Sequence, residues 1–303
     1  MVPKDYSPVS GDGRLRFTKM HGIGNDYIYI DCRYYSPLHP EDLSVFLSDR
    51  HKGIGGDGII LICPSSIADF KMRIFNADGS EAKMCGNGSR CVAKYVYDFG
   101  LTPKTSLTLE TLSGVKYITL AIGKDGKTES ATVDMGIPVL TPADIPVNAS
   151  GNIRIPVDVL GRKLEVTAVS MGNPHGVIFV DDLSLTDVHA LGRELEKHPM
   201  WSDRANIEFA QVLNPHEIRM RVWERGSGET QACGTGACAT AVAASLLGLA
   251  DKQDVTIHLL GGDLSISRRE ADGHVMMNGP ATTVFTGEIQ LPDNLKEFVQ
   301  ALR

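Results

Sequence analysis

Two of the six cysteines stand in the same unusual setting and are the first candidates for chemistry. Cys85 begins "CGNG" and Cys233 begins "CGTG", and each turn leads into a stretch of helical periodicity. A thiol at a helix N-terminus faces unpaired backbone N–H groups and the positive end of the helix dipole, which both favour its thiolate. A free thiol has a pKa of about 8.5, so a modest decrease would make it a base near neutral pH. The glycines beside each cysteine allow the backbone to approach a bound carboxylate closely.

Paired thiols suit one kind of reaction in particular. A reaction that inverts a carbon centre removes a proton from one face and returns a proton to the other. It therefore needs an acid and a base on opposite sides, and these exchange roles when the direction reverses. Cys85 and Cys233 fit that requirement if each lies in its own domain and both face one cleft.

Other interpretations of the cysteines stay open at this stage. A buried small apolar side chain is the commonest role of a free cysteine, and we expect it for Cys32, Cys63, Cys91 and Cys238. Zinc ligation by the pairs Cys85/Cys91 and Cys233/Cys238 fits the usual ligand spacings poorly. A redox disulfide between Cys85 and Cys233 is a further alternative. So are a hydrolase or transferase that uses one covalent thiol, and an amino-acid-binding module with structural cysteines.

The two cysteine turns belong to a repeat that extends along the chain. Sliding the sequence by the 148 residues that separate Cys85 from Cys233 places "MRIFNADGSEAKMCGNG" on "MRVWERGSGETQACGTG". The same offset places Gly24-Asn25 on Gly172-Asn173. Matches in one order at one offset indicate a duplicated domain.

The elements that must position the cysteines follow from local patterns. Short β-branched and aromatic runs such as 58–63 and 106–111 predict strands in the first half, and 206–213 and 217–223 predict strands in the second. Helices are predicted over 41–50, from Cys85 to about Gly100, and over 234–250. Each domain is therefore expected to wrap strands around one central helix that begins at its cysteine.

Length and charge limit the classes of function. The 303 residues suit two domains, and a net charge of -7 argues against nucleic acid as a partner. No apolar run is long enough to span a membrane, and residues 1–14 are expected to be a flexible extension without a signal peptide. Reduced thiols in the cytoplasm are the expectation for such a chain.

The motifs resemble those of the diaminopimelate epimerase family, whose members are pyridoxal-phosphate-independent amino-acid epimerases. The matching segments run from Phe17 to about Ile289 and are "FTKMHGIGNDYI", "FNADGSEAKMCGNGSRC", "SMGNPH", "RANIEF", "WERGSGETQACGTGA" and "GPATTVFTGEI". Proline racemase-like enzymes share the paired turns, but their first turn usually carries His where this chain has Asn87.

The resemblance implies a fold and an activity. The fold is α+β, with two pseudo-symmetric domains that each wrap a mixed sheet or barrel around a central helix. The implied domains are 15–133 plus 283–303, and 134–282, with the active site in the cleft between them. The implied reaction converts LL- to meso-2,6-diaminopimelate by two-base proton transfer, without cofactor or metal, in lysine and peptidoglycan precursor synthesis. A homodimer is also implied. The alternative is a racemase of another small amino acid.

The resemblance also implies roles for individual residues. Cys85 and Cys233 are the acid/base pair, and His175 and Glu224 tune the two thiols. The implied substrate ligands are Asn25, Asn76, Gly86, Asn87, Asn173, Asn206, Glu224, Arg225, Gly234 and Thr235. Among these, Glu224 and Arg225 bind the distal ammonium and carboxylate, and the two helix N-termini hold the reacting carboxylate.

One position departs from the family pattern. Many members have Asp-Gln where this chain has Asp57-Gly58, and that Gln contacts the substrate. Under the 148-residue offset, Gly58 falls on Asn206, so the first repeat lacks a side-chain donor there. The segment "GIGGDG" at 53–58 resembles a dinucleotide-binding motif, but it follows a helix and precedes a strand, which is the reverse of that motif's setting.

Overall fold

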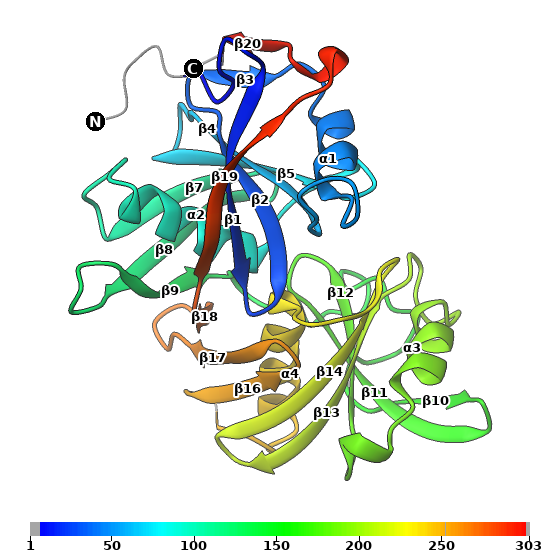
Figure 1. The fold of residues 1–303 in the computed structure, drawn as a ribbon. Coiled ribbons are helices and arrows are strands. Elements are labelled where there is room, and N and C mark those ends of the chain that lie inside the picture. The colour runs from blue at the N-terminus through cyan, green and yellow to red at the C-terminus, as the bar shows by residue number, and fades with distance from the viewer. Residues whose placement is uncertain (1–6, 252, 301–303) are drawn as a thin grey trace. The chain divides into compact units, whose positions relative to one another are not determined.

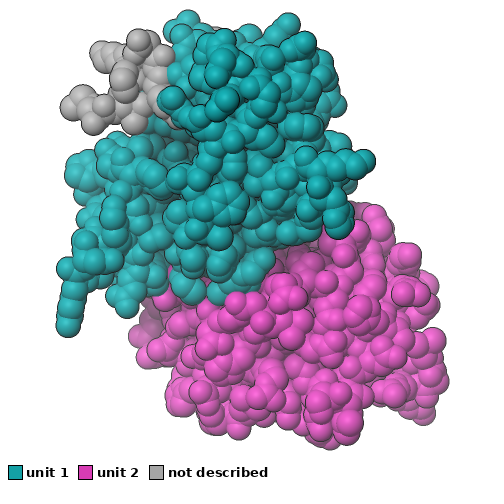
Figure 2. All heavy atoms as spheres, viewed as in Figure 1, with its two compact units in different colours: residues 1–133, 280–303 teal, residues 134–279 magenta. Residues whose placement is uncertain are grey.

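The computed structural model describes residues 7–251 and 253–300 and divides the chain into two compact units. Unit 1 comprises residues 1–133 and 280–303, and unit 2 comprises residues 134–279, as the two colours of Figure 2 show. In each unit a curved, mixed sheet surrounds one long helix (Figure 1). The fold is therefore α+β and pseudo-symmetric, as the sequence predicts.

Unit 1 is built around helix α2 (Gly86–Asp98), which packs against β1, β2 and β8. A second helix, α1 (Pro40–Ser48), covers β4 and β5 on the outside. The strands of this unit are β1 (Arg14–Gly22), β2 (Asn25–Asp31), β3 (Tyr35–Pro37), β4 (Gly58–Cys63), β5 (Phe70–Asn76), β6 (Glu81–Ala82), β7 (Ser106–Thr111), β8 (Gly114–Ile122), β9 (Thr128–Asp134), β19 (Thr282–Gln290) and β20 (Phe298–Gln300), with a 3-10 turn at Asp293–Leu295.

Unit 2 repeats this plan around helix α4 (Gly234–Leu246), which packs against β11, β12, β13 and β17. The outer helix is α3 (Val188–Glu196), and it packs against β13 and β14. The strands are β10 (Ile155–Val159), β11 (Arg162–Ser170), β12 (Pro174–Phe179), β13 (Asn206–Asn214), β14 (Glu217–Glu224), β15 (Gly228–Thr230), β16 (Val255–Leu259), β17 (Gly262–Arg268) and β18 (Val275–Gly279), with a 3-10 turn at Leu183–Leu185.

Strand registers confirm the repeat residue by residue. The parallel pair β2–β4 places Tyr27 opposite Gly58, and the parallel pair β12–β13 places His175 opposite Asn206. Tyr27 and His175 are 148 residues apart, as are Gly58 and Asn206, and the same offset separates the two cysteines. The boundaries of α1 and α3, and of α2 and α4, obey the same offset.

One strand of unit 1 comes from the far end of the chain. Antiparallel β19 pairs with β1 from Arg14↔Gln290 to His21↔Thr282. In unit 2 the equivalent of β1 is β11, and it pairs with β10, which directly precedes it in the chain. The chain thus completes unit 1 only after unit 2 has been made.

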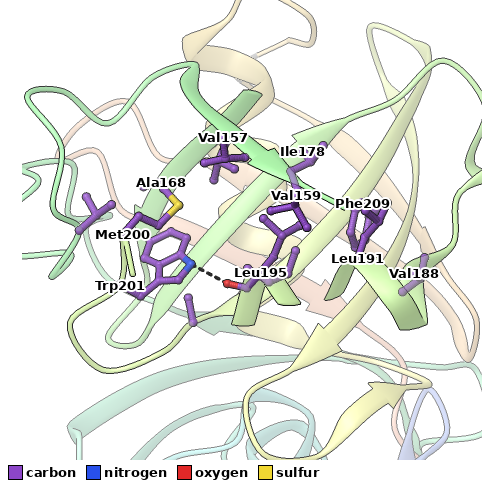
Figure 3. Packing of buried hydrophobic residues seen from close by; sticks show 14 of the residues in the cluster. Val157, Val159, Ala168, Ile178, Val188, Leu191, Leu195, Met200, Trp201 and Phe209 are labelled. Atoms are coloured by element: carbon purple, nitrogen blue, oxygen red, sulfur yellow. Dashed lines mark hydrogen bonds between the residues drawn. The ribbon is translucent and has the colours of Figure 1, made fainter. Parts of the chain in front are cut away.

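The core of unit 2 shows how an outer helix is held. Val188, Leu191 and Leu195 of α3 recur at helical spacing and are buried together with Trp201 (Figure 3). The indole Nε1 of Trp201 donates to the Leu195 carbonyl oxygen at 3.0 Å, so its polar atom is satisfied inside the apolar cluster. Burial of a large apolar side chain stabilises a fold by about 1.5–3 kcal/mol, so this cluster fixes the position of α3 on the sheet.

The predicted N-terminal extension is described only in part. Residues 1–6 of the expected flexible segment 1–14 lie outside the described residues. Val9 forms a β-bridge with Leu15 and packs against the unit 1 core, and the Ser10 amide donates to the Arg14 carbonyl oxygen. Residues 7–13 are therefore tied to the domain rather than loose. None of the helices in the described ranges is long and apolar enough to cross a membrane.

Candidate active site

Each candidate cysteine caps the central helix of its unit. Cys85 precedes α2 with an extended backbone, and its Sγ accepts a hydrogen bond from the Gly88 amide at 3.3 Å. Cys233 precedes α4 in the same conformation, and its Sγ accepts from the Gly236 amide at 3.4 Å. The sulfur thus takes the place that a Ser or Asp oxygen usually holds at an N-cap. Both thiols lie where the helix dipole favours negative charge.

The amide side chain of Asn25 lies beside Cys85 in unit 1. The Cys85 thiol donates to Asn25 Oδ1 at 3.4 Å, and the Asn87 Nδ2 lies 3.5 Å from the same oxygen. Asn25 Nδ2 donates to the Asp57 carboxylate at 2.8 Å. The buried guanidinium of Arg90 donates to Asn87 Oδ1 at 2.8 Å. Two of the predicted substrate ligands, Asn25 and Asn87, are therefore brought together with the predicted base.

The surroundings of Cys233 in unit 2 are equivalent in plan but different in chemistry. Thr235 Oγ1 lies 3.5 Å from Cys233 Sγ, and Asn173 Nδ2 donates to that hydroxyl at 3.4 Å. His175 Nε2 lies 3.1 Å from Asn173 Oδ1, and His175 Nδ1 lies 2.7 Å from Glu208 Oε1. His175 and Glu208 are completely buried. A chain of polar contacts thus runs from a buried carboxylate to the second thiol.

Charge and burial act on Cys233 in a direction opposite to our expectation. Burial, and after it the charges of Glu224 and Glu208, raise the pKa of the Cys233 thiol well above its usual range. Hydrogen bonds from Thr235 and Gly236 oppose this increase only in part. The increase is opposite to the decrease that the helix end alone predicts for Cys233, because two carboxylates and the loss of water outweigh the helix end. This site favours the neutral thiol, which is the form that a proton donor needs.

Glu224 lies close to the second thiol. Its carboxylate accepts a hydrogen bond from the Thr230 hydroxyl and one from Cys233. Burial raises the pKa of the Glu224 carboxyl, and these two hydrogen bonds oppose the increase. The side chain therefore contacts the Cys233 thiol directly.

Arg225, Asn206 and Asn76 make contacts within their own units. The Arg225 guanidinium donates to the carboxylate of Asp203 at 2.9 Å, and the Arg225 amide donates to Asn206 Oδ1 at 2.9 Å. Asn76 ends β5 and donates from Nδ2 to Ser80 Oγ at 3.1 Å. The register of β13 and β14 places Ile207 opposite Trp223, as that of β4 and β5 places Ile59 opposite Phe75.

The remaining predicted ligands form the helix ends. Gly86 and Asn87 are the first two residues of α2, and Gly234 and Thr235 are the first two of α4. Backbone N–H groups in the first turn of a helix have no intrahelical acceptor. The first turn of α2 thus lies beside Cys85, and the first turn of α4 lies beside Cys233.

Gly58 occupies a place that admits no side chain on this backbone. A Cβ atom built there would lie 2.1 Å from the Phe75 carbonyl oxygen and 2.8 Å from the Tyr27 ring. The Gln found here in many family members would require the backbone of β4 to shift. The local packing thus excludes a side-chain donor at position 58.

Sequence reasoning missed three residues of these sites. Glu208 lies in a predicted strand, where a charged residue among apolar neighbours could have indicated a site residue. Arg90 stands inside the quoted motif "CGNGSRC" and is fully buried. Thr230 precedes the second cysteine turn by a few residues and donates to Glu224. Glu208 meets His175 from 33 residues away, which no local pattern reveals. Arg90 and Thr230 contact Asn87 and Glu224, three and six residues away, so the quoted motifs already contained both partners.

The other four cysteines lie where small apolar side chains are expected. Cys32, Cys63, Cys91 and Cys238 are buried, and all six cysteines are free thiols. Burial is the main cause that raises the pKa of Cys63 to about 11 and raises those of Cys32 and Cys91. Within the described residues, no group of three or more His, Cys, Asp or Glu side chains is arranged to hold a metal ion.

Solved structures show the class of fold. A PhzF-family protein from Bacillus anthracis matches 92% of this chain with a TM-score of 0.65 and 17% identity, over 99% of its own length. A hydroxyproline epimerase from Agrobacterium vitis matches 91% of both chains with a TM-score of 0.65 and 15% identity. The chain therefore has the two-unit, pseudo-symmetric fold of these proteins, here with a cysteine at the N-cap of each central helix.

The chain belongs to the diaminopimelate epimerase family. The sequence model of that family matches residues 17–141 and 167–284. Diaminopimelate epimerases from Acetivibrio thermocellus and Desulfovibrio desulfuricans are 50% and 54% identical to it, covering 91% and 90% of this chain and 99% and 98% of their own lengths. One from Agathobacter rectalis is 51% identical over 91% of this chain and its own full length.

Proposed function

We propose that this protein interconverts LL- and meso-2,6-diaminopimelate by moving a proton at one α-carbon, without a cofactor. The observation that carries the proposal is the pair of N-cap thiols at equivalent places of the two repeats. Family membership at about half identity over most of the chain supports diaminopimelate as the substrate.

Inversion of the α-carbon uses both thiols, one as the base and the other as the acid. The thiolate of one cysteine takes the α-proton, and the bonding electron pair stays on the carbon next to the carboxylate. The thiol of the other cysteine gives its proton to the opposite face of that carbon. Each turnover therefore ends with the roles of Cys85 and Cys233 exchanged. The raised pKa of Cys233 supports its service as the proton donor in one direction.

Charge on the reacting carboxylate is the main obstacle to removal of the α-proton. We propose that the first-turn amides of α2 and α4, at Gly86, Asn87, Gly234 and Thr235, bind this carboxylate. Preorganised N–H donors stabilise negative charge as it develops, and the loss of one such donor typically reduces kcat by about 10²–10³-fold. Asn25 and Asn173 lie beside these turns and are proposed as further ligands.

The far end of the substrate carries a second ammonium and a second carboxylate. We propose that Glu224 and Arg225 bind them, with Asn76 and Asn206 as additional hydrogen-bond partners. The contact of Arg225 with Asp203 supports this role, because Asp203 holds the guanidinium in a defined position before the substrate arrives. His175 is buried and contacts Asn173, so we propose that it orients that ligand.

Isotope exchange tests the proposal directly. The protein is incubated with LL-diaminopimelate in heavy water, with no added cofactor, and deuterium at the α-carbon is measured by mass spectrometry. Exchange together with formation of the meso isomer is the expected result. Absence of exchange would refute the proposal and would favour a covalent thiol mechanism or simple amino-acid binding.

A racemase of another small amino acid is the second candidate, since solved structures of a hydroxyproline epimerase and a probable proline racemase share the fold. Their identities of 15% and 16% support only the fold. The same exchange assay with proline, hydroxyproline and lysine separates the candidates. Exchange into any of these as fast as into diaminopimelate would favour the broader activity.

The cellular setting is proposed from the same evidence. The reaction would supply lysine and peptidoglycan precursor synthesis in the cytoplasm, where six free thiols stay reduced. We further propose a homodimer, because Val284 and Phe285 expose apolar surface on β19. Sedimentation of the purified protein, compared with Val284→Glu, tests this association.

A further inference from the structure

The glycine-rich loop at residues 53–58 has no role in the reaction proposed above. Its backbone crosses β2 closely: the Asp57 amide donates to the Asp26 carbonyl oxygen at 2.7 Å. A Cβ at Gly56 would lie 2.8 Å from the Lys19 ammonium and 3.1 Å from that same carbonyl oxygen. The loop is therefore built to bring the Asp57 side chain next to the start of β2, where Asn25 lies.

The Asp57 carboxylate determines which way the Asn25 amide faces. Its Oδ2 accepts from Asn25 Nδ2 at 2.8 Å and from the Asp26 amide at 3.1 Å. An ionised carboxylate has no proton to donate, so the amide nitrogen must face Asp57. Asn25 Oδ1 is then turned toward Cys85, whose thiol donates to it at 3.4 Å.

The second repeat orients its asparagine with other residues. The position equivalent to Asp57 is Ala205, and the equivalent asparagine, Asn173, is held by His175 instead. Asn173 directs its Nδ2 toward the helix turn of Cys233, where it meets Thr235 Oγ1. The two homologous asparagines thus present opposite ends of their amides to the two cysteine turns.

We propose that Asp57 is a positioning residue, which holds Asn25 with its amide oxygen toward the Cys85 thiol and thereby opposes ionisation of that thiol. An amide oxygen stabilises the S–H form by accepting its proton, whereas an amide N–H would stabilise the thiolate. The inference rests on the proposed role of Cys85 as an acid/base, and it assigns the loop 53–58 to control of that residue.

Other charged and titratable groups surround this pair. Arg50 bridges the carboxylates of Asp57 and Asp26, and Lys19 binds Asp26 from β1. On the other side, Arg90 of α2 contacts Asn87, and Tyr29 of β2 lies near enough that the charge of Cys85 contributes to its raised pKa. Asp57 accepts the hydrogen bond from the Asn25 amide nitrogen, whereas Arg50 and Lys19 bind carboxylates, so removal of the Asp57 carboxylate releases that amide.

The test is the pH dependence of alkylation of Cys85 by iodoacetamide, followed by peptide mass spectrometry. In Asp57→Asn the carboxamide can donate as well as accept, so Asn25 is free to reverse, and a negative charge is lost. Both effects favour the thiolate. We expect the midpoint for Cys85 to fall by about one pH unit, which corresponds to about tenfold faster alkylation below the midpoint. The midpoint for Cys233 should stay unchanged.

Two further variants separate orientation from general loosening. Arg50→Gln breaks the same ion-pair network but leaves the Asp57–Asn25 bond, and it should give no decrease in the midpoint. The exchange Asn25→Asp/Asp57→Asn restores a carboxylate–amide bond with an acceptor facing Cys85, so it should return the midpoint to the wild-type value or above.

Two results would overturn the inference: an unchanged Cys85 midpoint in Asp57→Asn, or an equal decrease in Arg50→Gln. If Asp57→Asn does not fold, the exchange variant decides, and a midpoint below the wild-type value there would also overturn it. Failure of the proposed function shows separately, as absence of deuterium exchange in the unmodified wild-type protein, whatever the alkylation midpoints are.

Discussion

Replacement of Gly236 by Ala tests how firmly the carboxylate of Glu208 is held beneath the second thiol. A Cβ at Gly236 would lie 2.6 Å from Glu208 Oε1 and 3.2 Å from Cys233 Sγ. The equivalent position of unit 1 is Gly88, where a Cβ would lie 2.7 Å from Ile60 Cδ1. The two substitutions are therefore matched in sequence and helix position, and they differ in the atom that must move.

The expected magnitudes follow from what each neighbour can do. Ala stabilises a helix interior by about 1 kcal/mol relative to Gly, and this gain applies to both variants. In Gly88→Ala the end of an Ile side chain shifts, at an overpacking cost of about 1 kcal/mol, so the net change is near zero. In Gly236→Ala the Glu208 carboxylate must leave its 2.7 Å contact with His175, and a buried charged hydrogen bond contributes about 1.5–3 kcal/mol. We expect a net loss of about 0.5–2 kcal/mol.

Urea unfolding of both variants, followed by circular dichroism, measures this difference. Gly236→Ala should unfold at a lower urea concentration than Gly88→Ala, which should stay close to wild type. Glu208 is equivalent to Ile60 of unit 1 under the 148-residue offset. The double variant Gly236→Ala/Glu208→Ile therefore reproduces the pair that Gly88→Ala forms with Ile60. It should be more stable than Gly236→Ala/Glu208→Gln. Equal midpoints for the two alanine variants would refute the view that the Glu208 carboxylate is anchored.

Three further outcomes are expected. Cys85→Ser and Cys233→Ser should each reduce epimerisation by at least about 10²-fold, because a hydroxyl is a much weaker base. Each variant should still catalyse elimination from one stereoisomer of an analogue with a β-leaving group, and the two variants should act on opposite stereoisomers. Full epimerase activity in either variant would contradict the paired mechanism. Arg225→Lys should raise the KM for diaminopimelate by about tenfold or more in steady-state assays, because Lys cannot reproduce a bidentate carboxylate contact; an unchanged KM would place the distal carboxylate elsewhere. Burial raises the pKa of the Cys233 thiol, so its contribution to stability is complete below the unfolded value of about 8.5 and is lost as pH rises toward the folded value. Cys233→Ala should thus lose less unfolding free energy than wild type as the pH rises above about 8.5, and parallel pH curves would argue against a raised pKa.

Much of the architecture can be predicted from the sequence because it depends on local pattern and on internal repetition. The 148-residue offset relates the boundaries of α2 to those of α4, and it places both cysteines at N-caps. Strand β4 begins and ends at the predicted residues, since a run of branched apolar residues between glycine-rich and proline-containing segments favours a buried strand. Family motifs supplied the candidate ligands, because their residues are contiguous in the chain.

Tertiary structure alone decided how the two halves of the repeat differ. Glu208 meets His175 across the parallel pair β12–β13, and Asp57, directly before β4, meets Asn25 of the neighbouring strand β2, at separations of 33 and 32 residues. Whether a carboxylate faces an imidazole or an amide there depends on which strands the sheet places side by side, and no local propensity encodes that. The pairing of β1 with β19 joins residues more than 260 positions apart. The sequence by itself determined that there are two thiols at two helix ends, through periodicity and repetition. The folded units determined what surrounds each thiol, because burial, charge and hydrogen-bond direction arise from contacts between distant segments.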